Sequence, residues 1–255
     1  MTEPKASSQR TKGVDSARRA LQILMQFSET TPELTVENLL ETHEMSLPSA
    51  YRYISLLREM NLIEERRKGH FVLSPAVIRL ARAAELSFDY PDVVQPVLDR
   101  LRDETGEAAL YLRHLNDHAV CTAIAETDHQ IKLSFQPGSL MPLHGGAAAK
   151  VLLASFSKAK RASYLARHCS GLSDTARERL EQELDAIRAS GSAQSTGEVD
   201  KGIWATASTV DVHGRQVGAL TVAAPGFRIG EDERKDIIRR VSEAAAELEE
   251  RLEGA

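Results

Sequence analysis

The sequence predicts an α+β protein with two domains, an N-terminal winged helix-turn-helix joined by a linker helix to a larger domain built on an antiparallel sheet. Three observations predict this fold class. Three short amphipathic segments lie close together near the N-terminus, two short apolar segments around a basic turn follow them, and hairpin-like strands are interspersed with helices in the rest of the chain. A length of 255 residues exceeds one typical domain of ~100–150 residues, so two domains fit it.

Changes in sequence pattern mark the domain boundaries. We expect a disordered N-terminal arm at 1–13, the winged helix-turn-helix at 14–75, the linker helix at 76–89 and the second domain at 90–255. Apolar residues at steps of three and four predict helices at 15–27, 36–42 and 47–60, capped in turn by Asp15 or Ser16, Thr35 and Ser46. The hairpin has strands at 62–65 and 71–73 around a turn at 66–70.

The linker helix, predicted at 76–88, carries a wide apolar surface. Its main stripe comprises Val77, Leu80, Ala81, Ala84 and Phe88, and Ile78 and Leu86 widen it. A surface of this width has to be covered by other protein groups. It either packs on the chain's own domains or forms the seam of a dimer, and the sequence does not favour one over the other.

The second domain shows strands and helices in a mixed order. Helices are predicted at 92–105, 145–155, 158–168, 174–189 and 231–252, and strands at 108–115, 119–126, 131–135, 203–210 and 216–224. Asn116-Asp117 and His213-Gly214 supply turn residues between successive strands. Hairpin-joined strands with helices outside predict an antiparallel α+β domain.

The composition excludes some classes of protein. The chain is 42% hydrophobic and 27% charged with a formal net charge of −5, so binding to nucleic acid would depend on a local arrangement of cations. No apolar stretch reaches the ~20 residues needed to span a bilayer, and residues 1–13 lack the apolar core of a secretory signal. Two distant cysteines fit a reducing compartment. We therefore expect a cytoplasmic protein with no membrane partner.

The third helix is the candidate DNA-reading element. One face carries the apolar residues Leu47, Ala50, Ile54 and Leu57, and the opposite face carries Pro48, Arg52, Ser55 and Glu59, flanked by Ser49, Tyr51 and Tyr53. A recognition helix reads bases mainly with its N-terminal half, and an arginine there can form two hydrogen bonds with a guanine. The candidate DNA contacts on this helix are Ser49, Tyr51, Arg52 and Ser55.

Cations near this helix extend the candidate surface. Arg66, Arg67 and Lys68 are expected at the tip of the wing, and Arg18 and Arg19 on the first helix supply further phosphate contacts. A basic hairpin turn is often only a solvated loop. A capped third helix with a polar N-terminal face followed by a basic wing is a stronger signal than either feature alone, and it favours binding to double-stranded DNA.

The order of these motifs resembles the IclR family of transcription regulators. The resemblance rests on Leu34-Thr35-Val36, Ser49-Ala50-Tyr51-Arg52-Tyr53-Ile54, residues 56–63, residues 141–154, Gly202-Ile203-Trp204-Ala205-Thr206-Ala207 and residues 214–222. It extends from Val14 to Leu252. It implies a GAF-like effector-binding second domain, homodimers or homotetramers, and control of catabolic genes through operator DNA and a small-molecule effector. Ser195 and Ala223 stand where some members place polar effector ligands.

A glycine pair opens the helix predicted at 145–155. Gly145 and Gly146 would let a ligand approach the backbone, and the free N–H groups and dipole of a helix N-terminus favour a carboxylate. His144 would add a hydrogen bond. The alternative is that the glycines only permit tight packing at the helix start.

The resemblance implies further pocket residues. The full effector-binding set is His144, Gly145, Gly146, Ala147, Ala148, Leu133, Met141, Ile203, Ala205, Thr221 and Ala223, with Leu140 and Trp204 as additional apolar lining. Because alanine stands at several positions that are polar in other members, we expect an apolar pocket. The expected ligand is an aromatic or other bulky carboxylic acid, or a lactone-like catabolite.

Other motifs do not point to catalysis. His114 and His118 flank a predicted turn and lack further zinc ligands, and no base is evident for the adjacent His168 and Cys169. We expect Cys121 in a core strand and Cys169 at a helix end. No metal or cofactor motif is found, so the protein is not expected to be an enzyme. The alternatives are a regulator without an effector and an enzyme on a GAF-like domain.

Overall fold

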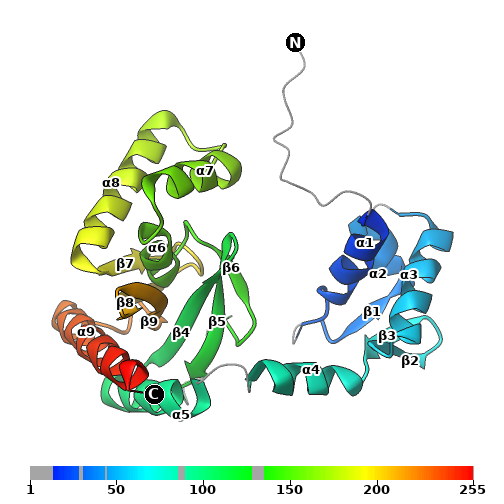
Figure 1. The fold of residues 1–255 in the computed structure, drawn as a ribbon, viewed down its shortest axis with the longest axis horizontal. Helices are drawn as coiled ribbons and strands as arrows, with labels where there is room; N and C mark the ends of the chain where they lie inside the picture. Colours follow the sequence, from blue (N-terminus) through cyan, green and yellow to red (C-terminus); the bar gives the residue numbers. More distant parts are fainter. Residues whose placement is uncertain (1–13, 29–30, 44, 86–89, 128–134, 255) are drawn as a thin grey trace. The chain divides into compact units, whose positions relative to one another are not determined.

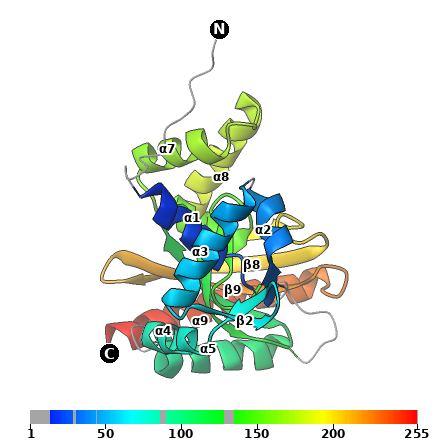
Figure 2. The ribbon, with the colours of Figure 1, turned by 90° about the vertical axis from the view of Figure 1, so that its right-hand side faces the viewer.

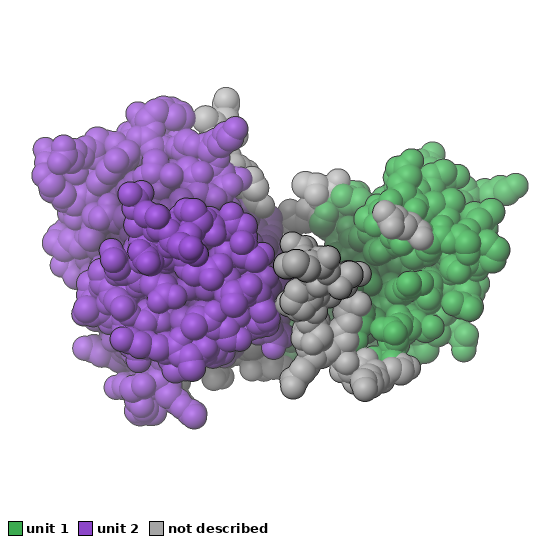
Figure 3. All heavy atoms as spheres, turned by 90° about the horizontal axis from the view of Figure 1, so that it is seen from above, with its two compact units in different colours: residues 1–88 green, residues 89–255 purple. Residues whose placement is uncertain are grey.

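The computed structural model describes residues 14–28, 31–43, 45–85, 90–127 and 135–254. The chain divides into two compact units, residues 1–88 and 89–255, which are coloured separately in Figure 3. The expected N-terminal arm at 1–13 lies outside the described residues, as do Leu133 and most of the strand predicted at 131–135.

The N-terminal unit is a winged helix. Its elements are α1 (Asp15–Leu24), β1 (Glu33–Thr35), α2 (Val36–His43), α3 (Leu47–Glu59), β2 (Ile63–Arg67), β3 (His70–Leu73) and α4 (Ala76–Glu85). The strands form an antiparallel sheet in the order β1-β3-β2. Ile23 of α1, Leu39 of α2, and Ile54 and Leu57 of α3 are almost fully buried, so the three helices share one core that Phe71 of β3 completes.

Several local expectations for this unit need correction. α1 ends at Leu24 rather than Phe27, and its N-cap is Val14 with no side-chain cap bond, so neither Asp15 nor Ser16 caps it. Thr35 does cap α2, since its Oγ1 accepts a hydrogen bond from the Asn38 N–H at 3.2 Å. Ser46 is the N-cap of α3, but its hydroxyl lies 3.0 Å from the Ser49 hydroxyl instead of capping a backbone N–H.

The buried face of α3 differs from the predicted one. Leu47, in the first turn, is 49% exposed, whereas Tyr53 is 3% exposed. At about 100° per residue, the buried arc is centred on Ala50 and Leu57 and extends toward Tyr53. Leu47 lies at the edge of that arc, and Tyr53 therefore belongs to the core rather than to the polar face.

The C-terminal unit is built on an antiparallel sheet flanked by helices on both faces (Figures 1 and 2). Its helices are α5 (Tyr90–Thr105), α6 (Ala147–Ala154), α7 (Lys158–His168), α8 (Asp174–Ser190) and α9 (Glu231–Glu253). Its strands are β4 (Ala108–Leu115), β5 (His118–Ala125), β6 (Leu140–Pro142), β7 (Ser192–Thr196), β8 (Ile203–Val212) and β9 (Arg215–Pro225). The described strands form one sheet in the order β6-β5-β4-β9-β8-β7.

Each face of this sheet has its own core. Along β4, Ala108, Leu110 and Leu112 pack on the face that α6 covers, whereas Ala109 and Tyr111 pack on the face that α5 and α9 cover. Successive side chains of a strand point to opposite faces, so a strand covered on both sides is apolar throughout. The same alternation on β8 and β9 directs Ala205, Thr221 and Ala223 toward α6.

The structure contains strands that the sequence did not predict. β1, β6 and β7 are short, and β7 has the polar sequence Ser-Ala-Gln-Ser-Thr, so none of them shows an apolar alternation. Phe135, at the end of the predicted strand 131–135, is not in a strand. The α+β fold class, with its winged helix, linker helix and antiparallel sheet, is confirmed. None of the helices in the described residues is both long and apolar enough to span a membrane.

Candidate functional site

The exposed face of α3 carries the predicted polar residues. Tyr51 is 50% exposed, Arg52 and Ser55 are exposed, and Ser49 is half-buried against the Ser46 hydroxyl. The guanidinium carbon of Arg52 lies 5.4 Å from the ring centre of Tyr53, and a hydrogen bond from Arg52 lowers the pKa of that phenol. Tyr53 therefore holds the guanidinium of Arg52 against the edge of the core, while Arg52 as a whole stays exposed.

The wing presents cations and acids together. Arg66 and Arg67 end β2 and Lys68 lies in the turn, so the turn is shorter than the predicted one. A guanidinium nitrogen of Arg67 lies 3.0 Å from Glu33 Oε1 on β1, where His70 Nδ1 also lies at 2.6 Å. Because Arg67 and His70 both bond its carboxylate, the pKa of Glu33 lies below its ordinary value.

The two arginines of α1 have different environments. Arg18 is half-buried with its Nε 3.8 Å from the Asp15 carboxylate, whereas Arg19 is exposed. The structure therefore places Arg19 at the surface of the unit and engages Arg18 partly with its own helix.

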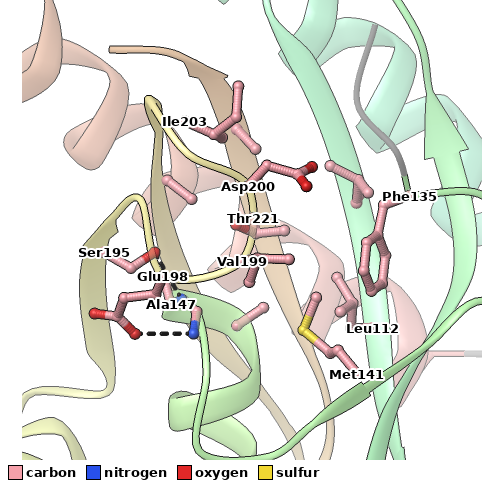
Figure 4. Close-up of a pocket in the computed structure, with 15 residues that line it drawn as sticks. Leu112, Phe135, Met141, Ala147, Ser195, Glu198, Val199, Asp200, Ile203 and Thr221 are labelled. Atoms are coloured by element: carbon pink, nitrogen blue, oxygen red, sulfur yellow. Dashed lines mark hydrogen bonds between the residues drawn. The ribbon is translucent and has the colours of Figure 1, made fainter.

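The C-terminal unit contains a cavity between the sheet and the N-terminus of α6 (Figure 4). Its empty volume is about 550 Å³, including space open to solvent. Most lining residues come from three places: β4, β7, β8 and β9 of the sheet, the start of α6, and the loop 197–202 between β7 and β8. Phe135 and Met141 close one side of it. Most of its lining side chains are apolar, which is typical of sites for small organic molecules.

Eight of the predicted effector residues line this cavity. They are Gly146, Ala147, Ala148, Met141, Ile203, Ala205, Thr221 and Ala223. Seven further residues also line it. Ser195 stands at a position where the resemblance implies polar effector ligands in some members, and the sequence prediction did not include the other six, which are Leu110, Leu112, Phe135, Glu198, Val199 and Asp200. Apart from the acids Glu198 and Asp200, the lining side chains in the described part of the chain are uncharged.

Three predicted residues do not line the cavity or cannot be placed there. His144 and Gly145 are not among its described lining residues, and His144 Nδ1 lies 2.8 Å from the Tyr164 hydroxyl. Leu133 is outside the described residues. Of the additional apolar residues, Leu140 is 46% exposed and Trp204 belongs to the core on the opposite face of the sheet.

The N-terminus of α6 already holds a carboxylate of the chain itself. The Gly146 N–H donates to Glu198 Oε2 at 3.0 Å, and the Ala147 N–H donates to Ser195 Oγ at 3.0 Å. Gly146 has φ +85°, and a Cβ there would lie 2.8 Å from Val199 Cγ2. The glycine is therefore required both by the backbone conformation and by the close approach of the loop.

A buried lysine reinforces this arrangement. Lys150 is 2% exposed, and its Nζ lies 2.7 Å from Glu198 Oε1 and 2.5 Å from Glu183 Oε1 of α8. Burial alone would lower the pKa of Lys150, but the hydrogen bonds to the two glutamates outweigh it and raise that pKa. Lys150 is thus charged, and Glu198 bridges it to the helix terminus.

The sequence contains a signal for this pair that our prediction did not use. Lys150 stands alone in the otherwise apolar helix Ala147–Ala154, all of which is buried. A lysine in such a segment needs a buried anionic partner. The partner Glu198 lies 48 residues away, so only the fold could identify it.

The other titratable residues form no catalytic group that we can identify in the described residues. Cys121 and Cys169 are buried free cysteines, and burial raises the pKa of Cys121 to about 12. Asp117 bonds His168 at 2.9 Å and Arg167, and these bonds lower its pKa although burial opposes them. No group of three or more potential metal ligands occurs in the ranges that the structure describes.

Family models match both units of the chain. The model described as the bacterial transcriptional regulator IclR C-terminal domain matches residues 87–250, and the IclR helix-turn-helix domain matches residues 16–67. This chain belongs to the IclR family. Its members bind DNA and regulate transcription, so the chain is an IclR-type DNA-binding transcription regulator and not an enzyme.

Individual IclR relatives extend over nearly the whole chain. The HTH-type transcriptional regulator KipR of Bacillus subtilis is 24% identical over 226 residues, which is 87% of this chain and 90% of KipR. A crystal structure of an IclR transcriptional regulator from Silicibacter sp. TM1040 has a TM-score of 0.76 at 25% identity, covering 94% and 97% of the two chains. An IclR homologue from Microbacterium hydrocarbonoxydans, solved with 4-hydroxybenzoate, has a TM-score of 0.78 at 16% identity and covers 94% and 100%.

Proposed function

We propose that this regulator changes its affinity for operator DNA when a small organic molecule, an aromatic or other bulky acid of catabolism, binds in the cavity of the C-terminal unit. The cavity carries the proposal: its lining is mostly apolar, and it includes the N-terminus of α6. The Microbacterium homologue bound to 4-hydroxybenzoate makes that acid a natural first probe.

On the DNA side, we propose that α3 enters the major groove. Tyr51, Arg52 and Ser55 share its exposed face, and Ser49 lies at its N-terminal end. The other proposed contacts, to phosphates, come from Arg66, Arg67, Lys68, Arg18 and Arg19. Arg67 and Arg18 would have to leave or share their acidic neighbours Glu33 and Asp15 to make them. From this role on operator DNA we propose a cytoplasmic location.

Assembly into a homodimer or homotetramer is part of the proposal. Ile78 and Leu80 of α4 are 57% and 55% exposed, and Ala81 and Ala84 are exposed beside them. These residues are not covered by their own unit. Exposed apolar surface of this kind favours a contact with a second copy of the chain.

The test uses an operator that the protein itself selects from random duplex DNA. A panel of catabolic organic acids, including 4-hydroxybenzoate, is first screened for an increase in melting temperature, since a ligand that binds the native state stabilises it. Each hit is then added to the protein–operator complex at constant salt. The proposal expects a hit to change operator affinity at least about tenfold. Hits that leave the affinity unchanged would support a regulator whose DNA binding needs no effector.

A variant that fills the cavity tests whether the ligand acts from there. Ala205→Phe places a ring among the lining residues on β8 and should remove the melting-temperature increase and the response of the operator complex together. A ligand that still acts on this variant would bind elsewhere, and the proposed cavity would be wrong.

A further inference from the structure

The carboxylate of Glu198 already occupies the end of the cavity at the N-terminus of α6, where an acidic ligand would bind. A carboxylate ligand would gain most from the Gly146 N–H and from the Lys150 ammonium, because both are donors and both favour negative charge. Lys150 is not itself among the described lining residues, so a ligand would meet it only in the place that Glu198 now occupies. In the structure, however, Glu198 takes the Gly146 N–H with one oxygen and Lys150 with the other.

We propose that Glu198 is an internal competitor, which an acidic effector displaces from Gly146 and Lys150 when it binds. This inference rests on the proposed effector function of the cavity. Glu198 would then set the effector concentration at which the protein responds. Release of the loop 197–202 would be the first event of binding.

The exchange is possible without burying or losing charge. One carboxylate replaces another, so the Lys150 ammonium keeps two anionic partners, the ligand and Glu183. Glu198 is half-exposed, with 35% of its side chain accessible, and it lies in a loop whose Val199 is 47% exposed. The displaced carboxylate can therefore enter water directly, where its desolvation is reversed.

The rest of the cavity explains why displacement is needed. The ionisable side chains among the described lining residues are both acids, and Asp200 points toward the side of the cavity on which Phe135 lies (Figure 4). An acidic ligand is repelled by these carboxylates unless it reaches the α6 terminus. A neutral ligand of the same shape has no such requirement and can occupy the apolar part with Glu198 in place.

The experiment compares benzoate with benzamide, which has the same ring but no charge, by calorimetric titration of the full-length protein. In Glu198→Ala the affinity for benzoate should rise by roughly tenfold or more, because a charge-assisted bond to an internal competitor no longer has to be broken. The affinity for benzamide should stay within about twofold of the original value.

Asp200→Asn is the matched control, since it removes one carboxylate from the same loop and from the same cavity lining. It should strengthen benzoate binding far less than Glu198→Ala does. Equal gains in the two variants would show a general charge effect and would overturn the proposal. An equal gain in affinity for benzamide would also overturn the proposal, because it would indicate only a larger cavity. A Glu198→Ala variant that fails to bind benzoate would overturn it as well.

A measurement on the unaltered protein guards against misfolding of the variant. Saturating benzoate should increase amide hydrogen exchange in the loop 197–202, whereas benzamide should not. Protection of that loop by benzoate would contradict displacement. The effector function itself is judged separately, by the operator response to the wider panel, so it can stand even where the Glu198 proposal fails.

Discussion

The phenol ring of Tyr111 fills the space in which a side chain at Gly218 would lie. A Cβ at position 218 would stand 2.3 Å from the Cζ and hydroxyl oxygen of Tyr111, which is fully buried. Tyr111 pairs with Leu220 across β4 and β9, so Gly218 is its diagonal neighbour on the same face of the sheet. Close packing between the central strands β4 and β9 therefore requires glycine at position 218.

Gly218→Ala should destabilise the C-terminal unit by about 1–3 kcal/mol, because the added methyl group overpacks a rigid ring. The single tryptophan, Trp204, is buried in this unit and reports its unfolding by fluorescence in urea. Gly171→Ala is the control, since a Cβ at position 171 meets no atom within 4 Å. If the two variants unfold at the same urea concentration, the ring of Tyr111 has room to move.

Arg52→Ala should weaken binding to the selected operator by roughly tenfold or more, as expected when the two hydrogen bonds from an arginine to a base are removed. Arg58→Ala is the matched control: it removes the same charge from the same helix, at the end where Arg58 pairs with Glu65 at 3.3 Å. Operator affinity is measured by fluorescence anisotropy. If both variants bind equally well, the recognition face of α3 has been misplaced.

Neutralising Arg66, Arg67 and Lys68 together should weaken binding to all DNA sequences alike. The slope of log affinity against log salt should fall by roughly 1 for each phosphate that the wing no longer neutralises. The measurement is a salt titration with operator and with unrelated duplex. A weakening confined to the operator would mean that the wing reads bases instead of phosphates.

The stability of the wing should depend on pH through Glu33. Because Arg67 and His70 hold its pKa below the ordinary value of 4.5, its contribution is full above that value and is lost as the pH falls through the lowered pKa. Glu33→Gln should therefore speed amide exchange in β1 and β3, relative to the unaltered protein, above pH 4.5 and not at strongly acid pH. A difference that is equal at all pH values would exclude titration of Glu33 as the cause.

Leu80→Glu on α4 should convert an assembled protein into a smaller species, because it places a charge in the proposed seam. Light scattering after size-exclusion chromatography measures the mass. Arg79→Glu changes the charge of the neighbouring residue, which lies about 100° away on the helix, and should leave the mass unchanged. An unaltered mass for Leu80→Glu would assign the apolar side of α4 to a role other than assembly.

The sequence predicted those helices and strands that are long enough to show a clear apolar periodicity. α7 and β4 have the predicted bounds, and the winged helix was recognisable from the order of α1 to β3. It could not show three-residue strands such as β1, which exist because Glu33–Thr35 pairs with β3. Nor could it show that Tyr53 is buried, since a tyrosine on the border of two helix faces is placed by its neighbours.

The candidate cavity was predictable where its residues lie in regular elements. Ala147, Ala205 and Thr221 face it because of their positions on α6, β8 and β9. Glu198, Val199 and Asp200 were missed because a loop carries no periodicity that would tell which side chains turn inward. The bond from Glu198 to Lys150 joins segments that only the folded chain brings together.

The loop 197–202 also has an evolutionary consequence. It contributes three lining side chains yet lies at the surface, outside both hydrophobic cores. Substitutions at Val199 or Asp200 would change the chemistry of the lining while the sheet and its helices keep their packing, whereas Glu198 also holds the buried Lys150. A lineage carrying this fold could thus change the ligand of the proposed effector site at these two positions, without the destabilisation that changes in the cores would bring.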